Sequence, residues 1–413
     1  MRIRVVFSIL ALAASVWAQT PFALKAGDRV VFFGDSITDQ RLYTTFAETY
    51  AVTRFAKAKI SFTHSGWGGD RVSGGGGGPI DVRIWRDILP YNPTVVTIML
   101  GMNDGRYRAF DQTIFDDFEK GYRYLVASLK RQVPAARITV IQPSPYDDVT
   151  RAPLFEGGYN NVLRRYGSFL KDLAASEKLH WSDMNTSVVD ALTKANATNA
   201  ADAAKLIPDR VHPGAAGHLL MAKALLESWN APALVSEVEI DASRKAVVAQ
   251  RNTTVSDFKA GGTMTWTALD EALPMPVDMK DALTALAVKS SDFHKALNQQ
   301  PLRITKLSPG NYGLAIDGQT IGTFSAEQLA AGINLAELAT PMTDQAMQVH
   351  SLTLQHSSIH NTRWRQVQVP LQKSNQPELL SAMKALDELE AVLVEEQRTA
   401  AQPKPHRFEL SAK

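Results

Sequence analysis

A serine that could act as a nucleophile stands at position 36, directly after a short apolar run. Residues 30–33 read Val-Val-Phe-Phe, and Gly34 and Asp35 separate this run from Ser36. Buried strands are rich in β-branched and aromatic residues, so we expect a strand that ends in a tight turn at the serine. Open α/β sheets bind their ligands at such carboxyl ends of strands. The alternative is that Asp35 and Ser36 only start a helix, because both residue types are common caps.

Three later segments carry the polar residues that a serine nucleophile needs as partners. They are Gly66–Asp70 (GWGGD), Gly101–Asp104 (GMND) and Asp209–His212 (DRVH). An imidazole takes the serine proton, a carboxylate orients the imidazole, and N–H donors stabilise the oxyanion. Each segment also has a plainer alternative: a flexible glycine turn, a helix cap, or a surface Asp–His pair. A metal site at Asp209 and His212 would lack a third ligand at a helpful spacing.

Five apolar stretches alternate with helical patterns through the first half of the chain. The expected strands are Arg29–Phe33, Ile60–Thr63, Val95–Leu100, Ile138–Ile141 and Leu179–Trp181. Such alternation implies parallel strands joined by helical crossovers. We therefore expect an α/β fold, a flavodoxin-like three-layer α/β/α sandwich with a parallel sheet, over about residues 20–230. Ser36, Gly66–Asp70 and Gly101–Asp104 each follow one of the strands and would meet at one edge of this sheet.

The sequence resembles the SGNH hydrolases, also called GDSL hydrolases, in four segments that occur in the family's order. Gly34–Ser36 matches the first family block, Gly66–Asp70 the second, Gly101–Asp104 the third, and Asp209–His212 the last. The match covers slightly more than the first half of the chain, and four blocks in order make a specific signal. The resemblance implies the SGNH hydrolase fold.

The same resemblance assigns roles to individual residues. Ser36 is expected to be the nucleophile, His212 the general base, and Asp209 the group that orients the imidazole. The backbone N–H groups of Ser36 and Gly69 and the side-chain amide of Asn103 are expected to form the oxyanion hole. This chemistry requires no metal and no cofactor.

The implied activity is hydrolysis of carboxylic esters through an acyl-enzyme intermediate. Exported bacterial members of the family often deacetylate polysaccharides, so a carbohydrate O-acetylesterase is the favoured interpretation. A lysophospholipase or a short-chain arylesterase is the alternative within the same chemistry. An alternative of another class is a non-catalytic glycan-binding protein on a hydrolase scaffold.

Several charged and aromatic residues adjoin these segments. Carboxylates next to catalytic positions are expected to hold loops through backbone N–H groups; here they are Asp35, Asp39 and Asp104. The residues that follow the oxyanion segments either line the substrate cleft or are solvated loop residues; these are Arg71, Arg106, Tyr107 and Arg108.

The composition is that of an ordinary globular protein. Of 413 residues, 45% are hydrophobic and 21% charged, the formal net charge is +2, and cysteine is absent. The small charge gives no reason to expect a nucleic-acid partner, and disulfides and thiol chemistry are excluded. The expected partner is a small-molecule or polysaccharide ester.

The N-terminus has the pattern of a secretory signal. Arg2 and Arg4 precede an apolar run over Val5–Val16, and small residues suit cleavage after Ala18. The run is shorter than the ~20 residues of a membrane span, so a retained anchor is the less favoured alternative. We expect a secreted or periplasmic protein.

These observations divide the chain into a signal peptide (1–18), a catalytic domain (19–230), a C-terminal α+β region (231–400) and a flexible tail (401–413). Strand patterns cluster between residues 235 and 324. A late amphipathic helix begins at Pro377, and its apolar stripe would pack on the body or on a second subunit as a homodimer. The stripe consists of Leu379, Met383, Leu386, Leu389 and Leu393.

Three histidines in this half invite a metal interpretation: His350, His356 and His360. Ser351–Gln355 alternates with a period of two, and no carboxylate lies nearby in the sequence. We expect surface or packing histidines instead. The C-terminal half could narrow the cleft, bind glycan or cell wall, or mediate dimerisation, and its sequence does not select among these roles.

Overall fold

A computed structural model of the chain describes residues 21–374 and 376–413; the predicted signal peptide lies outside them. A five-stranded sheet runs through the first half in the order β2-β1-β5-β6-β7, with every pair parallel. Its strands are β1 (Arg29–Gly34), β2 (Ser61–Gly66), β5 (Val95–Met99), β6 (Arg137–Ile141) and β7 (His180–Ser182). Each overlaps one of the five predicted strands, with bounds that differ by up to three residues, and their order is that of a flavodoxin-like sheet. A short hairpin, β3 (Gly74–Gly75) and β4 (Gly78–Pro79), lies outside this sheet.

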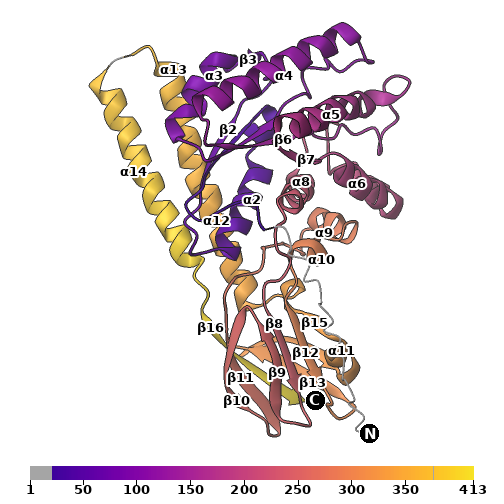
Figure 1. Cartoon of the computed structure of the whole chain (residues 1–413). Helices are drawn as coiled ribbons and strands as arrows, with labels where there is room; N and C mark the ends of the chain where they lie inside the picture. The colour runs from indigo at the N-terminus through magenta and orange to yellow at the C-terminus, as the bar shows by residue number, and fades with distance from the viewer. Residues whose placement is uncertain (1–20, 375) are drawn as a thin grey trace, which may run out of the picture.

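Helices cover both faces of the sheet, which confirms the predicted three-layer α/β/α sandwich (Figure 1). Helix α2 (Leu42–Arg54) packs on α8 (Ala215–Ser228), and α4 (Gln112–Gln132) lies beside α5 (Gly158–Glu177). The shorter helices are α1 (Ser36–Asp39), α3 (Ile80–Asp87), η1 (Leu89–Tyr91), α6 (Thr186–Thr198) and α7 (Ala200–Ala203). No helix within the described part of the chain is both long enough and apolar enough to cross a membrane.

The register of the sheet brings three turns to one level. Gly34 at the end of β1 lies opposite Gly66 of β2 and Met99 of β5. Two of these positions admit only glycine, because α1 crosses directly over the strand ends. A Cβ on Gly34 would lie 2.2 Å from Thr38 Oγ1, and one on Gly66 would lie 2.1 Å from the backbone nitrogen of Asp39. The residues that follow these strands are thereby held close together.

The second half contains two further sheets at one end of the molecule (Figure 1). One has the order β15-β12-β8-β9 and the other β10-β11-β16-β13-β14. The strands are β8 (Glu237–Asp241), β9 (Ala246–Arg251), β10 (Thr253–Lys259), β11 (Thr263–Asp270), β12 (Pro301–Thr305), β13 (Asn311–Ile316), β14 (Gln319–Ser325), β15 (Ile333–Asn334) and β16 (Pro405–Ala412). The helices among them are α9 (Ala282–Lys289), α10 (Phe293–Leu297), α11 (Ala326–Ala331) and η2 (Leu335–Glu337).

The prediction of a flexible tail over residues 401–413 is wrong. Pro405–Ala412 forms β16, which pairs with β11 on one side and β13 on the other, in the middle of its sheet. Phe408 is buried and stacks on Trp266 with 5.1 Å between the ring centroids. A strand of 8 residues that begins with proline has little local signal, since its partners lie far away in the sequence.

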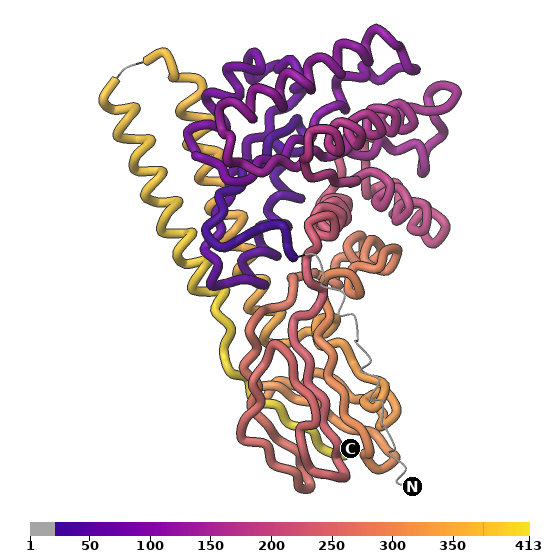
Figure 2. The backbone as a smooth tube through the Cα atoms, in the orientation of Figure 1, coloured from indigo at the N-terminus to yellow at the C-terminus, as the bar shows by residue number. Residues whose placement is uncertain are grey.

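The last helices return to the first half of the chain (Figure 2). They are α12 (Pro341–Asn361), the π-helical segment η3 (Thr362–Gln368), α13 (Val369–Leu371) and α14 (Pro377–Ala400). Helix α12 packs on α2 and β2, and α14 packs along α12. The alternation over Ser351–Gln355 was therefore misleading, because these residues are helical. Most of the apolar stripe on α14 is half-buried within this chain, so a homodimer through this helix stays a prediction.

A buried carboxylate joins the helical hairpin formed by α12 and α14 to the first half of the chain. Glu48 of α2 lies 3.0 Å from His64 Nε2 and 2.7 Å from His356 Nε2, and it accepts a hydrogen bond of 3.0 Å from Gln397 Nε2. Glu390 of α14 lies 3.7 Å from the other nitrogen of His356. The expectation of packing histidines holds for His356, but its carboxylate partners come from distant parts of the sequence.

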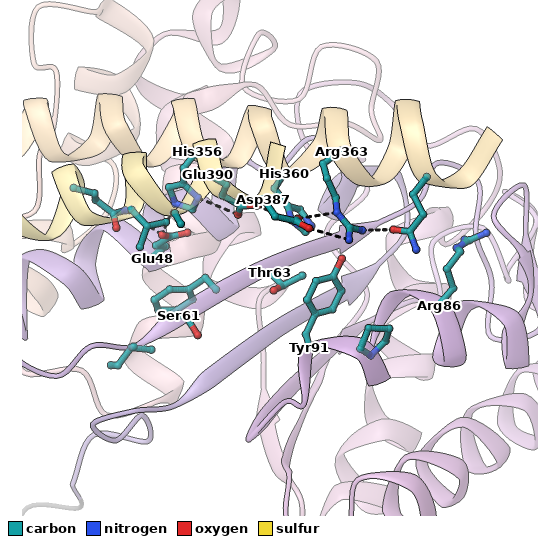
Figure 3. Close-up of a pocket in the computed structure, with 17 residues that line it drawn as sticks. Glu48, Ser61, Thr63, Arg86, Tyr91, His356, His360, Arg363, Asp387 and Glu390 are labelled. Carbon is teal, nitrogen blue, oxygen red and sulfur yellow. Dashed lines mark hydrogen bonds and ion pairs between the residues drawn. The ribbon is translucent and has the colours of Figure 1, made fainter. Parts of the chain in front are cut away.

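A cavity of about 440 Å³ lies between the hairpin and the edge strand β2 (Figure 3). The hairpin side contributes His360, Arg363 and Asp387, and Arg363 Nε lies 2.8 Å from Asp387 Oδ1. Opposite them lie Thr63 of β2 and Tyr91. The hairpin therefore covers an otherwise open sheet edge with charged side chains, most of which are paired with an opposite charge on the hairpin itself.

Stability should fall at alkaline pH through His356. Burial alone would lower the pKa of this imidazole, but the carboxylates of Glu48 and Glu390 raise it to about 10. The resulting stabilisation is complete below the unfolded value of ~6.5 and is lost as the pH rises towards the folded value. Between these limits, Tm should fall less steeply in His356→Gln than in the wild type. His350→Gln is the matched control on the same helix, because burial lowers the pKa of His350 to about 4. Equal pH slopes in His356→Gln and wild type would contradict this prediction.

Candidate active site

Three side chains predicted to act together form one hydrogen-bonded chain. His212 Nε2 lies 2.8 Å from Ser36 Oγ, and His212 Nδ1 lies 2.7 Å from Asp209 Oδ2. Ser36 and His212 are 176 residues apart in the sequence. The structure thus brings together a hydroxyl, an imidazole and a carboxylate in the geometry that activates a serine.

Ser36 owes its position to the junction of β1 and α1. Asp35 caps α1, since its Oδ1 accepts the N–H of Ile37 at 3.1 Å. Ser36 is the first residue of the helix, where a backbone N–H has no intrahelical acceptor. Burial raises the pKa of Asp35 to about 7. The cap therefore fixes the serine hydroxyl and leaves its N–H available to an oxyanion.

His212 is held by the loop that precedes α8. Both Val211 and His212 donate their backbone N–H to Asp209 Oδ1, at 3.0 and 2.7 Å. Burial pushes the pKa of Asp209 upward, but the hydrogen bonds from His212 and Val211 outweigh it, so the pKa lies below its ordinary value. Arg210 adopts a left-handed conformation with φ of 74° and accepts the N–H of Asp147 at its carbonyl. Asp209 is therefore ionised and aimed at the imidazole.

The segment Trp67–Asp70 presents one unused backbone donor. The N–H groups of Trp67, Gly68 and Asp70 donate to Gly34 O, Asp39 Oδ2 and Trp67 O respectively. Within the described residues the N–H of Gly69 donates to no acceptor. Gly69 has a φ of 75°, a conformation that favours glycine, and no atom lies within 4 Å of a Cβ built there. This arrangement suits the predicted oxyanion role of Gly69.

Asn103 is held on both sides of its amide. Its Nδ2 donates to Asp70 O at 3.0 Å, and its Oδ1 accepts the hydroxyl of Tyr107 at 2.8 Å. One N–H of the amide remains for a substrate oxyanion. The sequence predicts Tyr107 as either a cleft residue or a solvated loop residue; the structure shows that its hydroxyl orients Asn103. Tyr107 and its neighbour Arg106 both have positive φ angles, of 53° and 56°.

Tyr107→Phe should lower kcat by about tenfold, because Asn103 loses the hydrogen bond that fixes the orientation of its amide. KM should change little, since no contact to the acyl group is removed. Initial rates with p-nitrophenyl acetate measure both parameters. Tyr124→Phe, a change at an exposed tyrosine that hydrogen-bonds Asp81, is the control. Equal kcat values for Tyr107→Phe and wild type would contradict this role.

The carboxylates beside the site hold loops, as predicted. Asp39 Oδ2 accepts the N–H of Gly68 at 3.2 Å, and Asp104 Oδ1 accepts that of Val72 at 3.0 Å. Burial raises the pKa of Asp104 to about 7. Arg71 and Arg106 line a cavity of about 420 Å³ next to Asp104. Arg108 is exposed.

A buried ionic network beneath Gly66–Asp70 was not predicted. Arg83 of α3 is fully buried, and its Nε donates to Asp70 Oδ2 at 2.6 Å. Its guanidinium also pairs with Asp87, which accepts a hydrogen bond of 2.6 Å from Trp364 Nε1. In sequence, Arg83 and Asp87 resemble any exposed i,i+4 pair on a helix. Only the fold shows that they are buried under the oxyanion segment.

The arrangement can transfer an acyl group. A serine with a base supplies a nucleophile, and the donors at Ser36, Gly69 and Asn103 suit the oxyanion of a tetrahedral intermediate. Among the described residues, no three His, Asp or Glu side chains are grouped to hold a metal ion.

Comparison with known proteins extends these observations. The GDSL-like lipase/acylhydrolase family matches residues 32–220. An acetylxylan esterase from Geobacillus stearothermophilus is 25% identical over an alignment of 229 residues, which covers 49% of this chain and 94% of that protein. The solved structure of a gut microbial diltiazem-metabolizing enzyme is similar with a TM-score of 0.83 and 27% identity, over 96% of this chain and 100% of that one. The similarity to the diltiazem-metabolizing enzyme therefore extends over the C-terminal half of this chain.

Proposed function

We propose that this chain, a carboxylic ester hydrolase whose residues 32–220 match the GDSL-like lipase/acylhydrolase family, removes acetyl groups from carbohydrates. The observation that carries a serine mechanism is the hydrogen-bonded chain from Ser36 through His212 to Asp209. The preference for acetylated carbohydrate is supported by the similarity to an acetylxylan esterase.

In this mechanism Ser36 Oγ attacks the ester carbonyl carbon while His212 Nε2 takes its proton. The tetrahedral oxyanion accepts hydrogen bonds from the N–H groups of Ser36 and Gly69 and from the Asn103 amide. Collapse breaks the bond to the alcohol oxygen, which receives the proton from His212. A water then attacks the acyl carbon while His212 takes its proton. Collapse breaks the bond to Ser36 Oγ, which receives the proton from His212, and acetate is released.

Acetate release from a panel of acetylated glycans tests the substrate class. Wild-type protein should release acetate from acetylated xylan or pectin, and Ser36→Ala should not. Activity on p-nitrophenyl esters should be highest for acetyl and fall with acyl length. Rates that rise with chain length would favour a lysophospholipase instead. Absence of turnover on every ester and of fluorophosphonate labelling at Ser36, with retained polysaccharide binding, would favour a non-catalytic glycan-binding protein.

A second candidate substrate is an acetate ester of a smaller, non-carbohydrate alcohol. The observation that favours it is similarity to a diltiazem-metabolizing enzyme across both halves of the chain. Diltiazem, which carries an acetate ester, therefore belongs in the panel. A higher kcat/KM for diltiazem than for every acetylated glycan would decide for this candidate.

We also propose that the protein is exported, because Arg2, Arg4 and the apolar run Val5–Val16 have the pattern of a signal peptide. N-terminal sequencing of protein from the periplasmic and extracellular fractions should begin at Gln19. Full-length protein confined to the cytoplasm would contradict export.

A further inference from the structure

The π-helical segment η3 places Arg365 of the C-terminal half against the oxyanion segment. Arg365 Cζ lies 3.0 Å from the ring centroid of Trp67, and its Nη2 lies 3.9 Å from Asp39 Oδ2. π-Helical turns are rare and are found frequently at functional sites. Here the segment follows α12, and its Trp364 ring packs edge-on against the Trp67 ring with 5.8 Å between the centroids.

Asp39 connects Arg365 to the groups around the nucleophile. It lies one turn after Ser36 on α1, and its Oδ2 accepts the N–H of Gly68 at 3.2 Å. A Cβ built on Gly68 would lie 4.0 Å from Ser36 Cβ, so this stretch borders the serine directly. Gly69, with its unused N–H, is the next residue. A displacement of Asp39 would therefore move the predicted oxyanion donor.

The segment that carries Arg365 is firmly held. Trp364 is buried, and its Nε1 donates to Asp87 Oδ1 at 2.6 Å. Arg41 Nη1 of the catalytic half donates to the carbonyl of Ser357 at 3.1 Å. The Arg365 guanidinium thus reaches Asp39 from a segment that is fixed to the catalytic half directly by Trp364 and, through the preceding helix α12, by Ser357.

Two other guanidinium groups face Trp67 but do not take this position. Arg83 and Arg86 lie 5.6 and 5.2 Å from the Trp67 ring, and both pair with Asp87. Among the described residues, Arg365 is the only Lys, Arg or His with a side-chain nitrogen within 4 Å of the Asp39 carboxylate.

We propose that Arg365 is a positioning residue for the oxyanion hole and that the C-terminal half thereby completes the active site. Arg365 holds the Asp39 carboxylate and the Trp67 ring; Asp39 holds the Gly68 N–H, and Gly69 stays oriented towards the substrate oxygen. The inference rests on the serine-esterase mechanism proposed above.

Kinetics of Arg365→Ala on p-nitrophenyl acetate test this role in the full-length protein. We expect kcat to fall by about 10- to 100-fold, less than the ~100- to 1000-fold typical of deleting a donor outright, because Gly69 N–H remains but is misplaced. KM should stay close to the wild-type value. Methylguanidine added at a non-denaturing concentration should restore part of kcat in Arg365→Ala and leave wild-type kcat unchanged, which a merely structural role would not produce.

Arg363→Gln is the matched control. Arg363 lies on the same π-helical segment but pairs with Asp387 of α14. This variant should lose thermal stability while keeping the wild-type kcat. Arg365→Lys provides a second variant should Arg365→Ala fail to fold; it should retain the charge and part of kcat.

A double-mutant cycle tests the route through Asp39. In an Asp39→Ala background, Arg365→Ala should lower kcat by less than twofold, because the two residues act on one loop. A wild-type kcat in folded Arg365→Ala, or full additivity with Asp39→Ala, would overturn this inference while wild-type turnover upholds the esterase mechanism. A wild-type protein without turnover on any ester would overturn both.

Discussion

Ser36→Ala should lower kcat for p-nitrophenyl acetate by about 10⁴- to 10⁶-fold and leave the fold intact. The substitution removes only the hydroxyl group. Its oxygen, Ser36 Oγ, lies 2.8 Å from His212 Nε2 and forms the reacting end of the hydrogen-bonded chain. Asp35 would still cap α1, because that contact uses the Asp35 side chain and the N–H of Ile37. His212→Ala should cause a loss of similar size.

Stopped assays at high enzyme concentration measure the residual rate, and circular dichroism and Tm check the fold. Labelling with a fluorophosphonate should occur in the wild type and be absent from Ser36→Ala. Ser73→Ala, at an exposed serine outside the hydrogen-bonded chain, is the matched control and should keep wild-type kcat. Full activity in Ser36→Ala would refute the assignment of the nucleophile.

Asp209→Asn should lower kcat by about 10³- to 10⁴-fold through the tautomer of His212. One Asp209 oxygen accepts the N–H groups of Val211 and His212, and the other faces His212 Nδ1. An asparagine that keeps its oxygen on the backbone donors would turn its NH₂ towards Nδ1. His212 would then carry its proton on Nε2 and could not accept one from Ser36.

The lower end of this range is the better expectation, because the Asp209 side chain is 56% exposed and water can partly replace the carboxylate. KM should stay near the wild-type value, since the carboxylate faces the imidazole. Asp202→Asn, at a surface carboxylate that pairs with Lys205, serves as the control. A loss in kcat below about tenfold would mean that Asp209 only stabilises the loop and does not set the tautomer of His212.

Local signals were sufficient for the first half of the fold. Strand–helix alternation predicted the parallel sheet, since each strand is a compact apolar run and each crossover has a clear helical period. The candidate site residues could be grouped at one sheet edge for the same reason. Ser36 and Asn103 lie in the turns that follow β1 and β5, and parallel strands deliver their following turns to one edge, so linear order already implied spatial proximity.

Contacts between distant segments could not be predicted in this way. Whether residues 405–412 form a strand depends on β11 and β13, whose residues are remote in sequence. Glu48 and His356 are 308 residues apart, and nothing near either one indicates a buried pair.

By itself, then, the sequence determined the sheet and the strand-end turns that carry the candidate nucleophile, because these depend on short-range patterns and on the geometry of parallel strands; the roles of Ser36 and His212 followed from the family resemblance. Only the tertiary structure decided that the C-terminal helices cover the edge of β2 and bring Arg365 to Asp39. Burial of charged groups depends on which distant surface covers them, and hydrophobic periodicity carries no information about that choice.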